Sequence, residues 1–448
     1  MLTISIYALL GLTIASIEVF RFSRQRRIDA VTFFNLYYFL FFVFAPINVI
    51  LFGEAVVRQK YAYYAFGHGD EVTALCLLLA YLLFVLGFSV NPSLGKWSAL
   101  KTRAVETYSV RHAARIAVVF FVIGSLAMAY NVAQVGGLLE VIRQAPNIRS
   151  GEFMFESRFV FIRQFLSFLS CAFILFLAVY LGKKINHARV TAADRAALFV
   201  MAIAFFYYAL AAAGRREFIY PVLLYYLVSA SAGHRIGLKG AAVVMLVLLA
   251  GLVSTSLAIS ALLGVDRIAP YADEVLGVAY LNTVQGIADS FIHFVGMQHA
   301  PLWEFGFLTD LVELPLQLVP SRLFEFDRGR GMFGETTRFL LGEGLADDLS
   351  GEEAPGLHGY LLVNFGYPGM FLLFFFLGAA YRWLHNVFEP AERTDAVGWL
   401  FYWWVFFGFL VLFREGVIAL VIKQHASWWL AIGLLMLTGR RLGGTRSA

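Results

Sequence analysis

The stretch at residues 72–90 reads VTALCLLLAYLLFVLGFSV and contains no charged side chain. An α-helix rises about 1.5 Å per residue, so a helix of this length crosses a hydrocarbon core about 30 Å thick. Comparable apolar stretches recur along the chain, in which 60% of the residues are hydrophobic and 15% are charged. Water-soluble globular domains do not reach this composition. The sequence therefore predicts a polytopic membrane protein.

The spans are expected to be α-helices, because the strands of a membrane β-barrel show only short alternating segments of about ten residues. The first stretch, residues 2–20, lacks a basic region before it and a small-residue cleavage site after it, so we expect a retained helix and not a signal peptide. The predicted fold class is an all-α membrane protein of about 11 transmembrane helices, forming a single membrane domain over residues 1–448. The expected spans lie near residues 3–20, 30–51, 72–90, 114–133, 164–182, 196–213, 218–233, 240–262, 359–381, 396–413 and 417–437.

The basic residues give the expected orientation. If the N-terminus lies outside, more than half of the 35 Lys and Arg residues fall in inner loops, as the positive-inside rule requires. The C-terminus is then expected inside. This bias also accounts for the net charge of +5, so the charge does not indicate nucleic-acid binding.

One segment, residues 263–358, interrupts the series of spans and is expected to be a large external loop between transmembrane helices 8 and 9. It holds five of the 11 prolines and no apolar run of spanning length. Within it, residues 281–298 are amphipathic at helical spacing, with Asp289 and His293 one turn apart. We expect this helix to lie along the membrane interface or to re-enter between spans.

No metal site, cofactor site or disulfide is expected. Cys76 and Cys171 both fall in apolar spans, where neither a disulfide framework nor a multi-cysteine metal site is plausible. The chain has no P-loop, dinucleotide fingerprint, HExxH motif, zinc spacing or nucleophile elbow, and the adjacent pair Asp347-Asp348 lacks a metal-binding spacing. Any chemistry is expected to proceed without metal.

Arginines gather at the expected outer boundary, against the positive-inside bias. Arg215 and Arg216 occupy one tight turn between spans, and Arg414 occupies another. Other candidates in the outer loops are Arg143, Arg149, Arg158, Arg163 and Arg338. A guanidinium pairs bidentately with phosphate oxygens, so the functional interpretation is a diphosphate clamp. The alternative is that these arginines pair with lipid headgroups or with nearby acids such as Glu415.

His358 lies in Leu357-His358-Gly359-Tyr360, where the large loop returns to the membrane. An imidazole there can accept a proton from a sugar hydroxyl or hold that hydroxyl in place, which makes His358 the candidate catalytic residue. The alternative is a structural histidine. Residues 423–425, Lys-Gln-His, fall inside the last expected span and either line a substrate cavity or pair within the bundle.

Three sequence features together resemble a known family. They are the turn Ala213-Gly214-Arg215-Arg216-Glu217, the large outer loop, and the segment from Leu357-His358-Gly359 to Asn364-Phe365-Gly366-Tyr367-Pro368-Gly369. The chain resembles the O-antigen and oligosaccharide repeat-unit polymerases (Wzy type), which are related to the O-antigen ligases. In those ligases a histidine near the end of the large loop is tied to catalysis, and arginines at span ends face the lipid diphosphate. His358 and either Arg215 or Arg216 match those places, although the doubled arginine departs from the usual Gly-Ser-Arg-Gly-like turn.

The resemblance implies a GT-C-like membrane glycosyltransferase in the bacterial inner membrane, with its active site facing the periplasm. Donor and acceptor would be undecaprenyl-diphosphate-linked glycans, and a chain-length regulator is a further partner that the family implies. Two alternatives stay open. An O-antigen ligase would differ in its acceptor, and a lipid-linked oligosaccharide flippase or other transporter would also be basic and polytopic.

Overall fold

The computed structural model is helical throughout the part of the chain that it describes, with no strand there. The described residues are 2–25, 29–53, 61–67, 69–90, 110–150, 153, 155, 159–212, 215–232, 275–302, 331–342, 354–390, 394–416, 418, 421–422 and 425–443.

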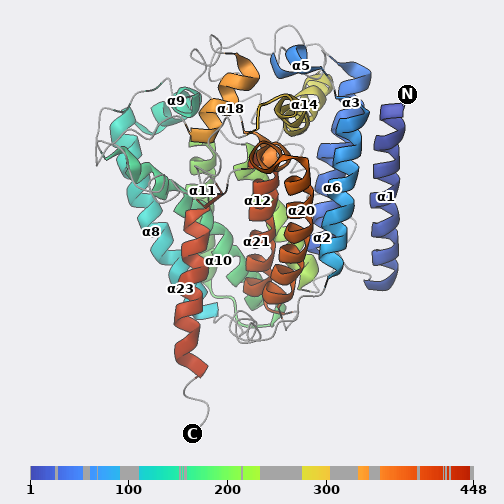
Figure 1. The fold of residues 1–448 in the computed structure, drawn as a ribbon. Helices are drawn as coiled ribbons and strands as arrows, with labels where there is room; N and C mark the ends of the chain where they lie inside the picture. Colours follow the sequence, from blue (N-terminus) through green and yellow to red (C-terminus); the bar gives the residue numbers. More distant parts are fainter. Residues whose placement is uncertain are drawn as a thin grey trace. The chain divides into compact units, whose positions relative to one another are not determined.

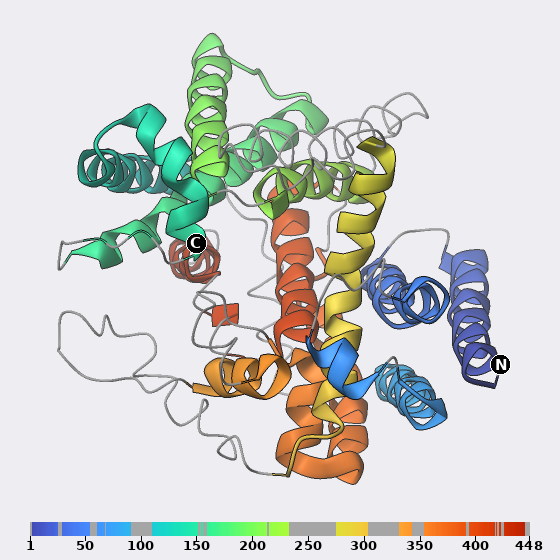
Figure 2. The same ribbon diagram turned by 90° about the horizontal axis from the view of Figure 1, so that it is seen from above.

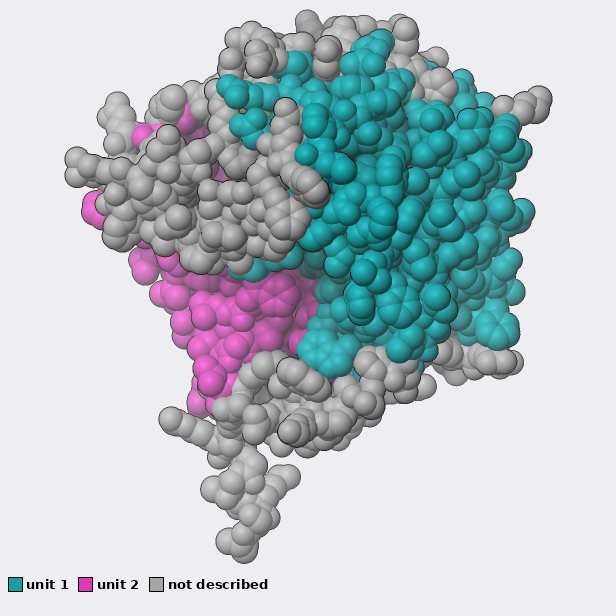
Figure 3. Space-filling view, in the orientation of Figure 1, with its two compact units in different colours: residues 1–94, 271–386, 406–424 teal, residues 95–270, 387–405, 425–448 magenta. Residues whose placement is uncertain are grey.

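The chain divides into two compact units, coloured separately in Figure 3. Unit 1 comprises residues 1–94, 271–386 and 406–424, and unit 2 comprises the rest. Helix α21 (Ala396–Glu415) contributes residues to both units. The units are described one at a time below.

Unit 1 contains a bundle of long apolar helices. They are α1 (Leu2–Gln25), the continuous run of α2 (Ala30–Phe39), η1 (Leu40–Phe44) and α3 (Ala45–Phe52), and α6 (Glu71–Ser89) (Figure 1). The middle piece, η1, is a π-helix, an uncommon widening of the helix that is often found at functional sites. Asp29 is the N-cap of α2, and its side chain accepts hydrogen bonds from the backbone N–H groups of Val31 and Thr32.

Helix α14 (Val275–Met297) lies across one end of this bundle. Seen from above, α14 runs along the page whereas α1 and α6 are seen nearly end-on (Figure 2). Its inner face packs on the bundle, where Phe291 meets Tyr7 of α1 edge to face at 6.1 Å. A helix is thus confirmed in the region predicted over residues 281–298, and it starts earlier, at Val275.

Helix α20 (Gly356–Phe388) is two helices joined at a break. Gly366 has φ +65° and ψ −179°, a conformation that only glycine adopts readily, and Pro368 follows it. Every residue from Gly356 to Asn364 is buried, so the short first part lies inside unit 1 on all sides. Figure 1 shows this first part end-on and the remainder along its length. The span predicted over residues 359–381 therefore contains a break that the prediction did not include.

The second part of α20 crosses α6 at a pair of glycines. A β-carbon on Gly87 would collide with the backbone of Phe375, and one on Gly378 would collide with the backbone of Phe84. The two helix backbones are thus in direct contact, an approach that only residues without a side chain permit.

Polar side chains link α1, α2 and α6 near the other end of the bundle. The two carboxylate oxygens of Glu18 accept hydrogen bonds of 2.6 Å each, from Thr32 and from Asn35. Tyr81 of α6 donates to the Asn35 side-chain oxygen at 3.0 Å, and Arg21 forms an ion pair with Asp29. These partners satisfy polar groups that would be costly to leave alone in an apolar bundle.

Unit 2 is built around α10 (Ser167–Ile185), which is buried along most of its length. It packs most extensively on α8 (Val110–Val135), where Gly124 lies against the backbone of Leu169. The 3₁₀-helix η3 (Val160–Leu166) leads into α10.

Four more helices complete the described part of unit 2, together with the first half of α21. They are α9 (Leu138–Ser150), α11 (Ala192–Ala211), α12 (Arg215–Ser231) and α23 (Ala426–Gly443). Val141 of α9 packs with Val135 and Ala211, and an ion pair of 2.7 Å between Lys183 and Asp194 joins α10 to α11.

Eight helices of the described residues are long and apolar enough to cross a membrane. They coincide with eight of the predicted spans and are Leu2–Ser23, Ala30–Phe52, Glu71–Ser89, Val110–Val135, Phe161–Ile185, Ala192–Ala211, Gly356–Phe388 and Ala396–Glu415. In the regions of two further predictions, the apolar helices Ile219–Ser231 and Ala426–Leu435 are shorter. The predicted span 240–262 lies outside the described residues.

Many large apolar side chains on these helices are exposed in the isolated chain. Leu12 of α1 is 66% exposed, Leu126 of α8 is 67% exposed and Phe199 of α11 is 67% exposed. Faces of this kind would be unfavourable in water and are suited to contact with lipid chains, which agrees with a polytopic membrane protein.

Candidate functional site

His358 lies in the first turn of α20, and its side chain is almost completely buried, with 2% of the residue exposed. Its Nε2 atom lies 3.1 Å from the hydroxyl oxygen of Tyr38, which belongs to α2. Its other ring nitrogen, Nδ1, has no hydrogen-bond partner among the described residues. The predicted catalytic residue is thus a buried side chain, and only one of its two ring nitrogens has a hydrogen-bond partner among the described residues.

Aromatic rings surround the His358 imidazole. The ring centroids of Phe42 and Phe374 lie 4.4 Å and 4.5 Å away, and those of Phe294 and Tyr38 lie 5.5 Å and 5.7 Å away. These residues come from η1, the second part of α20, α14 and α2, so four separate pieces of unit 1 form the enclosure. A bulky ligand could reach the imidazole only after one of these walls had moved.

The start of α20 touches the end of α21 through two glycines with positive φ. Gly356 has φ +67° and Gly416 has φ +81°, and a β-carbon on Gly416 would lie 2.5 Å from the carbonyl oxygen of Gly356. A β-carbon on Gly356 would lie 3.6 Å from the carbonyl oxygen of Arg414. The structure therefore brings together the segments that carry His358 and Arg414, two residues that are far apart in the sequence.

Helix α14 holds the chain just before this junction. The His293 ring donates a hydrogen bond from Nδ1 to the carbonyl oxygen of Ala354 at 2.8 Å. At its C-terminal end, α14 is joined to α6 by a hydrogen bond of 2.6 Å from Thr73 to Gln298. Gln298 in turn donates to the Tyr367 hydroxyl at 3.2 Å, next to the break in α20. Helix α14 is thus hydrogen-bonded to the chain close to where each of the two parts of α20 begins.

Two predicted arginines of unit 1 have described side chains. Arg414 is half exposed, with 51% of its side chain accessible and its Nε atom 4.0 Å from Glu415. Arg338 lies on α18 (Gly331–Leu341) and is 4.0 Å from Glu335. An exposed ion pair at this distance contributes little to stability, so both guanidinium groups can still bind an anion.

Two predicted arginines of unit 2 have described side chains as well. Arg143 on α9 is exposed and lies 3.7 Å from Glu140. Arg163 on η3 lies over the ring of Phe155, 4.1 Å from its centroid. A guanidinium on an aromatic face makes a cation–π interaction, which favours a structural role for Arg163.

For the remaining predicted arginines, the side chain or the whole residue lies outside the described part of the chain. Arg215 and Arg216 lie in the first turn of α12, whereas the sequence analysis placed them in the turn between two spans. The side chains of Arg149, Arg215 and Arg216, and the whole of Arg158, lie outside the described residues. The prediction that Arg215 and Arg216 lie close to Arg414 therefore stays a prediction.

Among residues 423–425, only His425 is described, and it is buried in unit 2. Its ring meets Trp404 edge to face at 5.2 Å, and Trp404 stacks on Trp428 at 3.9 Å. This packing favours the structural interpretation of His425. In the described part of the chain, no three His, Cys, Asp or Glu side chains gather as metal ligands.

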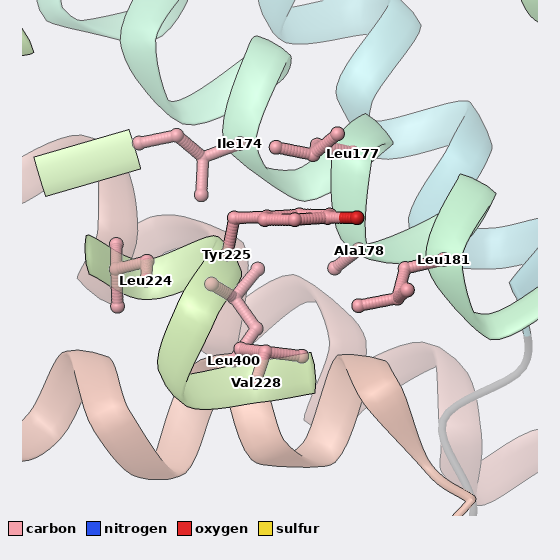
Figure 4. Close-up of a pocket in the computed structure, with 8 residues that line it drawn as sticks. All are labelled: Ile174, Leu177, Ala178, Leu181, Leu224, Tyr225, Val228 and Leu400. Atoms are coloured by element: carbon pink, nitrogen blue, oxygen red, sulfur yellow. The ribbon is translucent and has the colours of Figure 1, made fainter. Parts of the chain in front are cut away.

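Unit 2 also has a very small apolar pocket of about 10 Å³, which is partly open to the outside (Figure 4). Its lining consists of Ile174, Leu177, Ala178, Leu181, Leu224, Tyr225, Val228 and Leu400. Tyr225 supplies the only hydroxyl group of this lining, and none of the predicted site residues is present. A pocket of this volume has room for about one water molecule, so it is not a ligand site.

The sequence analysis did not find Tyr38, Gly416 or the enclosure around His358. Tyr38 lies in an apolar span that contains several tyrosines and phenylalanines, and nothing in its local pattern distinguishes it. Comparisons of the whole chain with protein-family models, curated proteins and solved structures give no match.

Proposed function

We propose that this protein is a metal-independent membrane glycosyltransferase of the GT-C type, which polymerises undecaprenyl-diphosphate-linked repeat units at the outer face of the bacterial inner membrane. The observation that carries the proposal is the contact between Gly356 and Gly416. It places a half-exposed arginine, Arg414, beside the start of α20, whose first turn carries His358. An anion-binding group and a proton-accepting group on adjoining segments are what transfer from a lipid diphosphate requires.

In the proposed reaction, a hydroxyl oxygen of the acceptor sugar attacks the anomeric carbon of the donor. The bond between that carbon and the diphosphate oxygen breaks, and the diphosphate leaves with the bonding electron pair. Arg414 stabilises the negative charge that develops on the diphosphate, because its guanidinium pairs bidentately with phosphate oxygens. His358 accepts the proton of the attacking hydroxyl. The predicted cluster of Arg143, Arg149, Arg158, Arg163, Arg215, Arg216 and Arg338 would supply further contacts to the lipid-linked substrates.

The burial of His358 adds one condition to this mechanism. Because the residue is only 2% exposed, the acceptor sugar can reach it only when an aromatic wall moves. One wall belongs to backbone that departs from a regular α-helix, because Phe42 lies in the π-helix η1. Phe374 lies in the regular second part of α20, beyond the break at Gly366. Such departures are common where helices must change shape during function.

A transporter of lipid-linked oligosaccharides is the second candidate, and the broken helix α20 favours it. Transporters commonly place their substrate sites at discontinuous helices, and α20 is broken at Gly366 with a polar residue, His358, on its buried first part. An O-antigen ligase would use the same chemistry as the polymerase with a different acceptor.

Deletion of the gene, followed by gel electrophoresis of the surface glycan, distinguishes the three functions. A polymerase predicts loss of the ladder of long chains with one repeat unit retained. A ligase predicts loss of all capped glycan while lipid-linked polymer accumulates. Accumulation of unpolymerised lipid-linked units on the cytoplasmic side would show a transporter and would overturn the proposal.

A further inference from the structure

The hydrogen bonds of Tyr38 determine which nitrogen of His358 carries a proton. The Tyr38 hydroxyl lies 2.8 Å from the carbonyl oxygen of Leu77 on α6. A carbonyl oxygen has no proton to give, so the hydroxyl must donate its one hydrogen to Leu77. The Tyr38 oxygen is then left with lone pairs alone for any other partner.

His358 is that other partner. Its Nε2 atom lies 3.1 Å from the same oxygen, and an oxygen that offers only lone pairs must receive a hydrogen. Nε2 is therefore the protonated nitrogen of the neutral ring. The two nitrogens of a neutral imidazole have opposite roles, so Nδ1 is left as an unprotonated acceptor.

The opposite tautomer would cost more. With the proton on Nδ1, Tyr38 would have to turn its hydrogen from Leu77 to Nε2 and lose the 2.8 Å bond. The Nδ1–H group would also be a buried donor without an acceptor among the described residues. This arrangement makes one hydrogen bond fewer and leaves a buried donor unpaired, whereas the first arrangement leaves only an acceptor unpaired.

The unpaired acceptor itself calls for an explanation. Nearly all buried polar atoms in native proteins have a hydrogen-bond partner, and Nδ1 of His358 has none among the described residues. The atom belongs to a residue that is 2% exposed, and aromatic rings enclose its imidazole. An unpaired, buried hydrogen-bond acceptor such as Nδ1 can bind a ligand that carries a hydrogen-bond donor.

We infer that Nδ1 of His358 is a binding site for a hydroxyl group of the ligand, and that Tyr38 is the positioning residue that keeps Nδ1 unprotonated. The identity of the hydroxyl as that of the acceptor sugar rests on the proposed function. Tyr38 acts through His358 and does not itself touch the substrate. The same arrangement fixes which ring nitrogen takes the proton when the hydroxyl attacks.

The tautomer can be measured without any assay of activity. Full-length protein labelled with ¹⁵N-histidine is placed in lipid nanodiscs, and the His358 signals are assigned by their loss in His358→Gln. We expect a protonated Nε2 and an unprotonated Nδ1 in the wild type. In Tyr38→Phe the hydroxyl is absent, so we expect a mixture of both tautomers. A wild-type spectrum with Nδ1 protonated would overturn the inference.

Tyr81→Phe is the matched control. Its ring lies 5.1 Å from that of Tyr38 and is equally buried, but its hydroxyl donates to Asn35 and not to the Leu77–His358 pair. We expect Tyr81→Phe to leave the His358 tautomer unchanged. A change of equal size in both variants would mean that general repacking sets the tautomer, which would also overturn the inference. Thermal midpoints of both variants show whether each is folded.

The activity measurement separates this inference from the proposed function. With purified lipid-linked substrate, we expect Tyr38→Phe to lower kcat by about tenfold or more at nearly unchanged KM, since a loss of the right tautomer removes a transition-state interaction. A shifted tautomer with unchanged kcat would overturn the hydroxyl-binding role of Nδ1. Wild-type protein with the expected tautomer and no transferase activity would overturn the proposed function and leave the tautomer assignment standing.

Discussion

Gly87 of α6 and Gly378 of α20 lie against each other so closely that neither position has room for a β-carbon. Each glycine touches backbone of the opposite helix, and a backbone cannot move aside as a flexible side chain can. We therefore expect Gly87→Ala and Gly378→Ala each to lower the free energy of unfolding by about 1–3 kcal/mol, the usual cost of overpacking. Thermal unfolding of the purified protein in detergent measures the effect.

Gly433→Ala is the control for this prediction. Gly433 also lies within a helix, α23, but a β-carbon there would meet no atom within 4 Å. Alanine is the better helix former by about 1 kcal/mol, so this variant should be as stable as the wild type or more stable. Wild-type stability in all three variants would show that α6 and α20 do not cross at these glycines.

The junction of Gly356 and Gly416 gives a second prediction. Gly416→Ala places a β-carbon both at positive φ and against the carbonyl oxygen of Gly356, so we expect losses of stability and of transferase activity. Gly67→Ala separates the two causes, because Gly67 has φ +78° and no atom within 4 Å of the added carbon. It should show the conformational cost alone, about 1–2 kcal/mol. Equal losses of stability in Gly416→Ala and Gly67→Ala would argue against the contact between Gly356 and Gly416.

His358→Ala should lower turnover by about a hundredfold or more, the usual effect of losing a positioned general base. His358→Gln retains a hydrogen-bonding side chain and should keep part of the activity if holding the hydroxyl matters more than removing its proton. The assay is polymer formation from purified lipid-linked substrate, normalised to folded protein. A loss of folded protein in step with activity would indicate a structural histidine, and full activity would remove His358 from the mechanism.

Arg414→Lys should impair transfer, because lysine keeps the charge but loses the planar fork that pairs with two phosphate oxygens. We expect kcat/KM to fall more for the donor than for the acceptor, because Arg414 is proposed to bind the diphosphate that leaves the donor. Arg189→Lys, at an exposed position in the loop that follows α10, is the matched control and should have no effect. If both variants work at the wild-type rate with normal expression, Arg414 does not bind the diphosphate.

The predicted orientation places residues 263–358 outside the membrane. Alkaline phosphatase folds into an active enzyme only after export, so a fusion within residues 300–350 should be active. A fusion after residue 443, at the expected cytoplasmic C-terminus, should be inactive. The reverse pattern would contradict the topology together with the assignment of the site to the outer face.

Hydropathy predicted the long helices well, because a span is a local property of about 20 residues. It failed where the backbone departs from a regular helix. Residues 40–44 form a π-helix inside an uninterrupted apolar stretch, which no hydropathy signal marks. The break in α20 did have a signal, since Gly366 and Pro368 stand together, but these residues were interpreted as the beginning of a span.

The candidate site was predictable residue by residue but not as an arrangement. His358 and Arg414 were chosen for their chemistry and their places at expected span ends. Their adjoining position depends on Gly356 and Gly416, which are 60 residues apart and reveal nothing of their contact in the sequence. The partner of His358, Tyr38, is 320 residues away in the sequence, so that only the tertiary fold brings the two together.

The polar contacts between α1 and α2 bear on how the chain enters the membrane during synthesis. Glu18 and Arg21 near the end of α1 find partners in Asn35 and Asp29, so two neighbouring helices satisfy each other's charged and polar groups. A newly made helical hairpin ending near residue 52 can therefore pair Arg21 with Asp29 and hydrogen-bond Glu18 before the rest of the protein has been translated. Since isolated charges oppose insertion, α1 and α2 should enter the bilayer together as a pair and not one after the other.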